Sequence, residues 1–225
     1  MEKQMINVPG ADALAQPHSR ADFLKKVAVA GVGATAGSAL LSRKAWGQSG
    51  DLEIANFALT LEYLEADYYA IALDSGMLSG DALSYIQATF EHESAHVEAL
   101  TGLIKDSGGT PVAKPEFMFG EAFASQSSIL STAATLEITG VGAYLGAAPM
   151  IQSPDVLAAA GSIAGVEGEH VVAINNLLGV VPPANMAFPE ALSQDAVLAA
   201  IAPFMGGAMP ETGGQAPVYG TGKAR

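Results

Sequence analysis

The chain has 225 residues, which is enough for one domain with appended segments and a sizeable core. It contains no cysteine, and this excludes disulfides, thiolate catalysis, iron–sulfur clusters and cysteine-ligated zinc. Its formal net charge of −13 excludes a nucleic-acid-binding face, because such a surface repels phosphates. Any metal site must therefore be built from Glu, Asp and His, which suit iron, manganese or zinc.

Residues 1–47 have the pattern of an export signal. A basic segment at 19–26 precedes a Gly- and Ala-rich apolar run at 27–41, which is too short for a comfortable membrane span. Residues 19–25 resemble the twin-arginine signal Ser-Arg-Arg-x-Phe-Leu-Lys, with Ala21 in place of the second arginine. We expect export to the periplasm or cell envelope, with no stable membrane span after cleavage. The alternative is an uncleaved anchor or amphipathic helix.

The region after the signal begins with two predicted helices, 51–74 and 79–105, capped by Asp51 and Ser79. Glu62 lies in the middle of the apolar stripe of the first helix, and Asp67 points outward.

The second helix carries Glu93 and His96, three residues apart. At about 100° per residue, this spacing places both side chains on one helix face. The remainder of that face is apolar: Ile86, Phe90, Val97, Leu100 and Ile104. A carboxylate and an imidazole on a buried face need a partner or a cation, and on a bundle helix a metal is the usual reason. For a single motif, a solvated chance pair is the alternative.

A third helix is predicted over 120–147, after a connection too long for a tight helical hairpin. Glu137 lies on its apolar face. Gly140 and Gly142 follow, and they indicate either close helix packing, or room for a ligand or a local helix distortion beside Glu137.

The fourth predicted helix, 154–178, contains a second Glu-x-x-His motif. Glu167 and His170 again lie on an apolar face. A shorter helix over 189–204 is expected to pack outside the bundle. The Gly- and Pro-rich tail from residue 206 is expected to be disordered.

An internal repeat relates the two halves of this region. Thr60-Leu61-Glu62 aligns with Thr135-Leu136-Glu137, and Tyr69 then aligns with Tyr144. Each half is therefore a helical hairpin with a lone Glu on its first helix and Glu-x-x-His on its second. Two such hairpins joined by one long crossover predict a four-helix bundle with a pseudo-two-fold axis through the site.

The repeat predicts one buried centre from six side chains: Glu62, Glu93, His96, Glu137, Glu167 and His170. Four carboxylates bring a charge of about −4 into the core, which two divalent ions would balance. We expect Glu93 and Glu167 to bridge the two ions. The other four residues would be terminal ligands, with the pairing of each His to a lone Glu left open.

The sequence also predicts where the other polar residues near these six side chains lie. Tyr69 and Tyr144 are either hydrogen-bonded to the ligands or ordinary core tyrosines. His92 is expected at a helix edge, and four further glutamates are expected in solvent: Glu65, Glu91, Glu98 and Glu169.

Several stretches resemble exported bacterial ferritin-like proteins, a group that includes the desiccation-related proteins. The resemblance covers residues 50–180 and rests on Leu-Glu-Tyr-Leu-Glu-Ala at 61–66, Leu-Glu at 136–137, Gly-Ala-Tyr-Leu-Gly at 142–146 and the two Glu-x-x-His motifs. It implies an all-α, ferritin-like four-helix bundle over 48–180. An N-terminal segment (1–47) would precede it, and a C-terminal extension (181–225) with a short helix and disordered tail would follow.

The leading hypothesis is an exported di-metal carboxylate protein holding iron or manganese, with zinc as a further option. It would react with dioxygen or peroxide, oxidising Fe(II) or removing peroxide under oxidative or drying stress. No separate catalytic acid or base is assigned. The alternative is a non-catalytic envelope protein stabilised by its metal. The expected partners are metal ions and the oxidant, without nucleic acid, and a homo-oligomer is left open.

Overall fold

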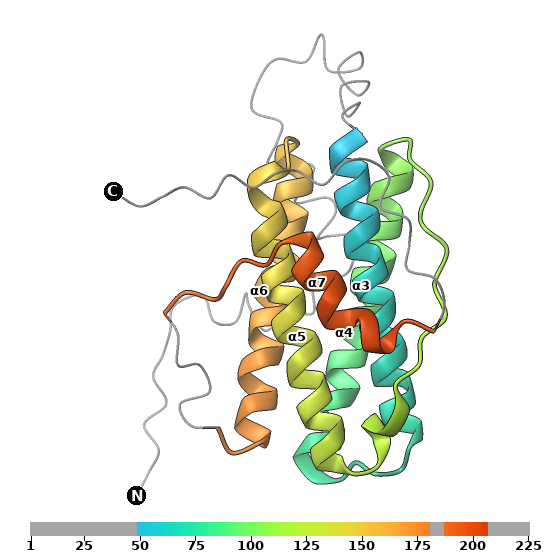
Figure 1. Ribbon diagram of the computed structural model, residues 1–225, viewed down its shortest axis with the longest axis vertical. Coiled ribbons are helices and arrows are strands. Elements are labelled where there is room, and N and C mark those ends of the chain that lie inside the picture. Colours follow the sequence, from blue (N-terminus) through green and yellow to red (C-terminus); the bar gives the residue numbers. More distant parts are fainter. Residues whose placement is uncertain (1–48, 181–186, 207–225) are drawn as a thin grey trace, which may run out of the picture.

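The computed structural model describes residues 49–180 and 187–206, so the expected signal and the tail lie outside the described residues. In these ranges every regular element is a helix, apart from an isolated bridge between Phe117 and Met205. Four long helices form a bundle (Figure 1): α3 (Ser49–Asp74), α4 (Gly80–Asp106), α5 (Gln126–Ala147) and α6 (Pro154–Leu177). The predicted all-α bundle is confirmed.

The bundle consists of two hairpins joined by a crossover. α3 packs along α4 and α5 along α6, while α3 also contacts α5 and α4 contacts α6. α4 ends at Asp106, and Gly108 just beyond the C-cap Ser107 has a φ of 79°, in the left-handed region. Residues 107–125 then run along the outside of the bundle, back to the end at which α4 began (Figure 1). This is the single long crossover that the sequence predicts.

The buried apolar residues fall into two clusters with the polar site between them. On α4, Ile86 belongs to one cluster and Leu100 and Ile104 belong to the other. Glu93 and His96 lie between these two groups along the helix. Apolar side chains therefore pack on both sides of the site along the bundle.

Asp51 does not cap its own helix, contrary to the sequence prediction. It lies within α3, and its carboxylate accepts hydrogen bonds from the backbone N–H groups of Gln152 (2.9 Å) and Ser153 (2.8 Å). These residues directly precede α6, so Asp51 joins the start of α3 to the start of α6. Ser79 is the N-cap of α4 by position, but its side chain makes no capping hydrogen bond and instead contacts Gln126.

Two predicted helices begin too early. α5 starts at Gln126 rather than at residue 120, because Ser125 is extended and its hydroxyl accepts the N–H of Ser128. The preceding Gly120–Phe123 is a separate 3-10 turn, η2. Likewise α7 (Gln194–Ile201) starts after the N-cap Ser193 rather than at residue 189.

α7 lies across the outside of the bundle, against α5 (Figure 1). The segment before it approaches α5 closely, because the Leu192 N–H donates to the Gly142 carbonyl at 2.9 Å. A Cβ on Gly142 would lie 2.5 Å from the Leu192 side chain, and one on Gly146 would lie 1.8 Å from the Leu192 carbonyl oxygen. For Gly142, close packing is therefore the correct one of the two interpretations.

α6 is long and apolar enough, by length and composition, to cross a membrane. The core helix of a bundle passes the same test, and α6 packs along α5 while carrying the buried Glu167 and His170. One such helix is weak support for a membrane span.

Candidate metal centre

The structure brings all six predicted residues together inside the bundle. Each helix of the bundle contributes: Glu62 comes from α3, Glu93 and His96 from α4, Glu137 from α5, and Glu167 and His170 from α6. The four glutamates are fully buried, and the two histidines are 8% and 2% exposed. Helical periodicity explains this, because each residue replaces one apolar position in the buried stripe of its helix.

The six residues form two overlapping groups of donor atoms. One group is Glu62, Glu93, His96 and Glu167; the other is Glu93, Glu137, Glu167 and His170. Within each group one donor atom per residue lies within 4.8 Å of all the others, so each group could hold a metal ion. Glu93 and Glu167 belong to both groups. The geometry places His96 beside Glu62 and His170 beside Glu137.

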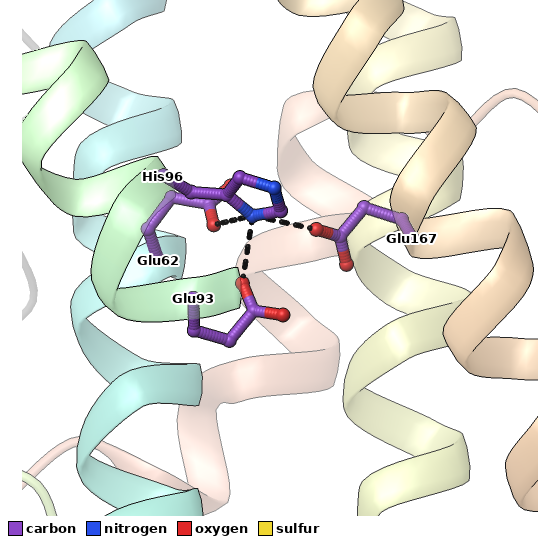
Figure 2. Close-up of side chains that lie close together, drawn as sticks. All are labelled: Glu62, Glu93, His96 and Glu167. Carbon is purple, nitrogen blue, oxygen red and sulfur yellow. Dashed lines mark hydrogen bonds and ion pairs between the residues drawn. The ribbon is translucent and has the colours of Figure 1, made fainter. Parts of the chain in front are cut away.

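In the first group, three carboxylates surround one imidazole nitrogen (Figure 2). His96 Nδ1 lies 3.1 Å from Glu62 Oε2, 2.9 Å from Glu93 Oε2 and 3.2 Å from Glu167 Oε1. A single N–H cannot serve three acceptors, whereas a cation can be shared by several lone pairs.

The second group repeats this arrangement. His170 Nδ1 lies 3.0 Å from Glu93 Oε1, 3.2 Å from Glu137 Oε2 and 4.0 Å from Glu167 Oε2. Both histidines therefore direct the same ring nitrogen toward the carboxylates.

The oxygens without hydrogen bonds identify the carboxylates that most need a cation. Among the described residues, Glu93 Oε1 and both oxygens of Glu167 are buried and accept no hydrogen bond. Two of them lie close to a histidine nitrogen, but not in hydrogen-bonding geometry. Leaving such atoms unpaired costs about 1–3 kcal/mol each, and more when the group is charged. Because these two residues are shared by both groups, the donor set fits a pair of bridged cations.

Without metal, the centre retains protons. Burial raises the pKa of Glu62 to about 7 and also raises the pKa of Glu167. Burial alone would lower the pKa of His170, but the carboxylates of Glu137 and Glu93 beside it raise it to about 10. Burial also opposes ionisation of Glu93, yet the imidazoles of His170 and His96 beside it lower its pKa. Protons thus take the place of cations in neutralising the carboxylates.

Two tyrosines connect the hairpins through the lone glutamates. The Tyr69 hydroxyl donates to Glu137 Oε1, and the Tyr144 hydroxyl donates to Glu62 Oε1. Each tyrosine thus contacts the glutamate of the opposite hairpin, as the pseudo-two-fold repeat requires. Of the two roles considered from the sequence, the hydrogen bond to a site residue is the correct one.

His92 contacts the centre, which sequence reasoning missed. It is exposed at the helix edge, as expected, but its Nδ1 lies 2.9 Å from Nε2 of His170. The two rings are stacked, with centroids 5.2 Å apart. His170 therefore uses one nitrogen toward the carboxylates and the other toward His92.

Glu65 was expected in solvent, and this prediction is wrong. It is 3% exposed, whereas Glu91, Glu98 and Glu169 are exposed as predicted. Glu65 lies one helical turn after Glu62, and that position still falls within the buried face of α3.

A four-helix bundle with buried carboxylates and two Glu-x-x-His motifs defines a class of metal-binding carboxylate bundles. The model of the ferritin-like domain family matches residues 50–180, and the chain belongs to this family. A search of curated proteins found no match to the chain.

Proposed function

We propose that the protein is a di-metal carboxylate protein whose two ions are bridged by Glu93 and Glu167. Glu62 with His96 would complete one coordination sphere, and Glu137 with His170 the other. The observation that carries the proposal is the sharing of Glu93 and Glu167 between two groups of mutually close donor atoms. Their unpaired buried oxygens support it.

The proposed metals are iron or manganese, with zinc as an alternative, because carboxylate and imidazole donors accept all three. Bound iron or manganese would supply two electrons to dioxygen or peroxide, so that the protein oxidises Fe(II) or removes peroxide under stress. The chain's own residues hold the donors in place. Tyr69 and Tyr144 fix the lone glutamates by hydrogen bonds, and the two apolar clusters pack on both sides of the site.

We further propose that the protein is exported to the periplasm or cell envelope and carries no membrane span once the signal is cleaved. This rests on the sequence pattern of residues 19–47, in which only Ala21 departs from the twin-arginine signal. N-terminal sequencing of the protein from the periplasmic fraction should show cleavage near residue 47. A full-length chain in the cytoplasmic fraction would contradict export.

The metal centre is tested by elemental analysis of the purified protein. We expect two ions per chain in the wild type and a loss of metal in Glu93→Ala and Glu167→Ala. Glu91→Ala is the matched control, because Glu91 lies on the exposed face of the same helix and should leave the metal content unchanged. Equal metal content in all four proteins would remove the assignment.

The reaction is tested separately by following dioxygen or peroxide consumption after Fe(II) or Mn(II) is supplied. Turnover by the wild type and its loss in Glu93→Ala would support the oxidoreductase function. Two bound ions without turnover would favour the non-catalytic alternative, in which the metal contributes only to folding.

A further inference from the structure

Glu65 is a buried carboxylate that the six-residue set leaves unused. It is 3% exposed, and its Oε2 atom accepts no hydrogen bond. A carboxylate buried in this way is stable only if it carries a proton or lies near a cation. Glu65 therefore needs an explanation of its own.

Its surroundings place Glu65 beside the proposed bridging carboxylate. An ideal Cβ on Gly140 of α5 would lie 3.2 Å from Glu65 Oε1 and 3.3 Å from Glu167 Oε2. Glu65 Oε1 and Glu167 Oε2 therefore lie at most about 6.5 Å apart. Gly140 leaves the space for both carboxylates, because an alanine methyl would press against each of them.

The internal repeat shows that this arrangement is one-sided. Glu65 follows Glu62 by three residues, and Gly140 follows Glu137 by three. Positions 65 and 140 are therefore equivalent in the repeat, and they also face each other between α3 and α5. Only one of them can carry a large side chain. The centre accordingly has an additional carboxylate on one side alone.

The additional charge changes the balance of the centre. Four carboxylates match the charge of about +4 on two divalent ions, and a fifth leaves an excess of about −1. Four glutamates repel a negative charge on Glu65, with Glu167 contributing most, followed by Glu137, Glu93 and Glu62. Burial and this repulsion raise the pKa of Glu65 in the metal-free protein. A pair of ions with a larger total charge would remove the excess.

We propose that Glu65 is a further carboxylate of the metal centre and gives it a preference for cation pairs that carry more than +4, such as trivalent ions. This inference rests on the proposed di-metal function. It concerns hard trivalent cations of the size of Fe(III), for which gallium(III) is a redox-inert probe.

The test compares the binding of Zn(II) and of gallium(III), supplied as citrate, to the wild type, Glu65→Gln and Glu91→Gln. Glu65→Gln keeps the side-chain shape but removes the charge, so gallium(III) affinity should fall by about tenfold or more while Zn(II) affinity changes far less. Glu91→Gln, the exposed control, should match the wild type for both ions. An unchanged gallium-to-zinc ratio in Glu65→Gln, or an equal loss of both ions, would overturn the inference.

Two further measurements separate this role from a structural one. The metal-free Glu65→Gln protein should unfold at the same or a higher temperature than the wild type, because glutamine is neutral without having to bind a proton. Gly140→Ala, which keeps Glu65 but fills its space, should also lower the gallium-to-zinc ratio. A wild-type ratio in Gly140→Ala would contradict the placement of Glu65. If the wild type bound neither ion, the proposed di-metal function itself would fail.

Discussion

His170 uses both of its ring nitrogens, and this distinguishes it from its counterpart His96. Its Nδ1 faces the carboxylates while its Nε2 contacts His92. The repeat places Val166 at the position equivalent to His92, so no imidazole can support His96 in the same way. If His170 binds a cation through Nδ1, its Nε2–H donates to His92, which fixes both the tautomer and the ring orientation.

His92→Ala should therefore weaken metal binding without unfolding the protein, because His92 is exposed. We expect a loss of about 10- to 100-fold in affinity, as is usual when the partner of a ligand histidine is removed. Calorimetric titration with Zn(II) would measure it, and the loss should fall on one of the two binding steps. His92→Asn should restore part of the affinity, since its amide oxygen replaces the Nδ1 acceptor. Wild-type affinity in His92→Ala would contradict this role.

At the scale of residues, the six candidate ligands could be predicted because each interrupts an apolar stripe and the repeat doubles the pattern. His92 could not be predicted, because its contact crosses from α4 to α6 and periodicity describes only one helix at a time. Glu65 was placed at the edge of its stripe. Only the approach of α5 at Gly140 shows that this edge is buried.

At the scale of elements, glycines set how closely the outer segment packs on α5. Gly146 lies directly beneath the Leu192 backbone, whereas Gly161 of α6 has no neighbouring atom within 4 Å of an added Cβ. The same substitution should therefore have opposite effects at these two positions.

Gly146→Ala should lower the free energy of unfolding by about 1–3 kcal/mol, because the methyl group displaces the segment before α7. Gly161→Ala should raise it by up to about 1 kcal/mol, since alanine favours the helix and meets no neighbour. Urea unfolding of the metal-free proteins measures both. Equal changes in the two variants would mean that the segment at Leu192 does not pack as described.

The four bundle helices and the crossover could be predicted from the sequence, whereas the ends of several helices could not. Asp51 is a residue type that is common at helix N-caps. Its carboxylate, however, accepts hydrogen bonds from the backbone at the start of α6, about a hundred residues away in the chain. The early starts predicted for α5 and α7 have a common cause. Ser125 and Ser193 are the true N-caps, and nothing local in the apolar pattern distinguishes the preceding residues from helix.

At the scale of the whole molecule, the bundle encloses a charged centre that is stable only when neutralised. The metal-free protein achieves this with protons, since the pKa values of Glu62, Glu65, Glu167, His96 and His170 are all raised. Glu93 has a lowered pKa, and so has His92 at the edge of the centre. The folded metal-free state therefore binds more protons than the unfolded chain.

The metal-free protein should lose stability as the pH rises. The unfolded chain releases the Glu62 proton near 4.5 and the folded state near 7, so folding becomes less favourable across this interval. The contribution of His170 is fully present below 6.5 and is lost as the pH rises through about 10. Thermal unfolding should give a lower midpoint at about pH 9 than at about pH 6.

The metal-loaded protein should show the opposite trend, because protons compete with the ions for the same donors and binding strengthens as they leave. The gap between the metal-loaded and metal-free midpoints should therefore widen with pH. A metal-free protein that gains stability from about pH 6 to about pH 9 would contradict the protonation assigned to the centre.

The central claim is that two ions share Glu93 and Glu167 between the four helices. Anomalous diffraction from crystals of the metal-loaded protein, recorded at the absorption edge of the bound metal, tests it most directly. The account predicts two peaks about 3.5–4 Å apart inside the bundle, each within bonding distance of both carboxylates. A single peak, or ions bound only at the surface of the bundle, would contradict it.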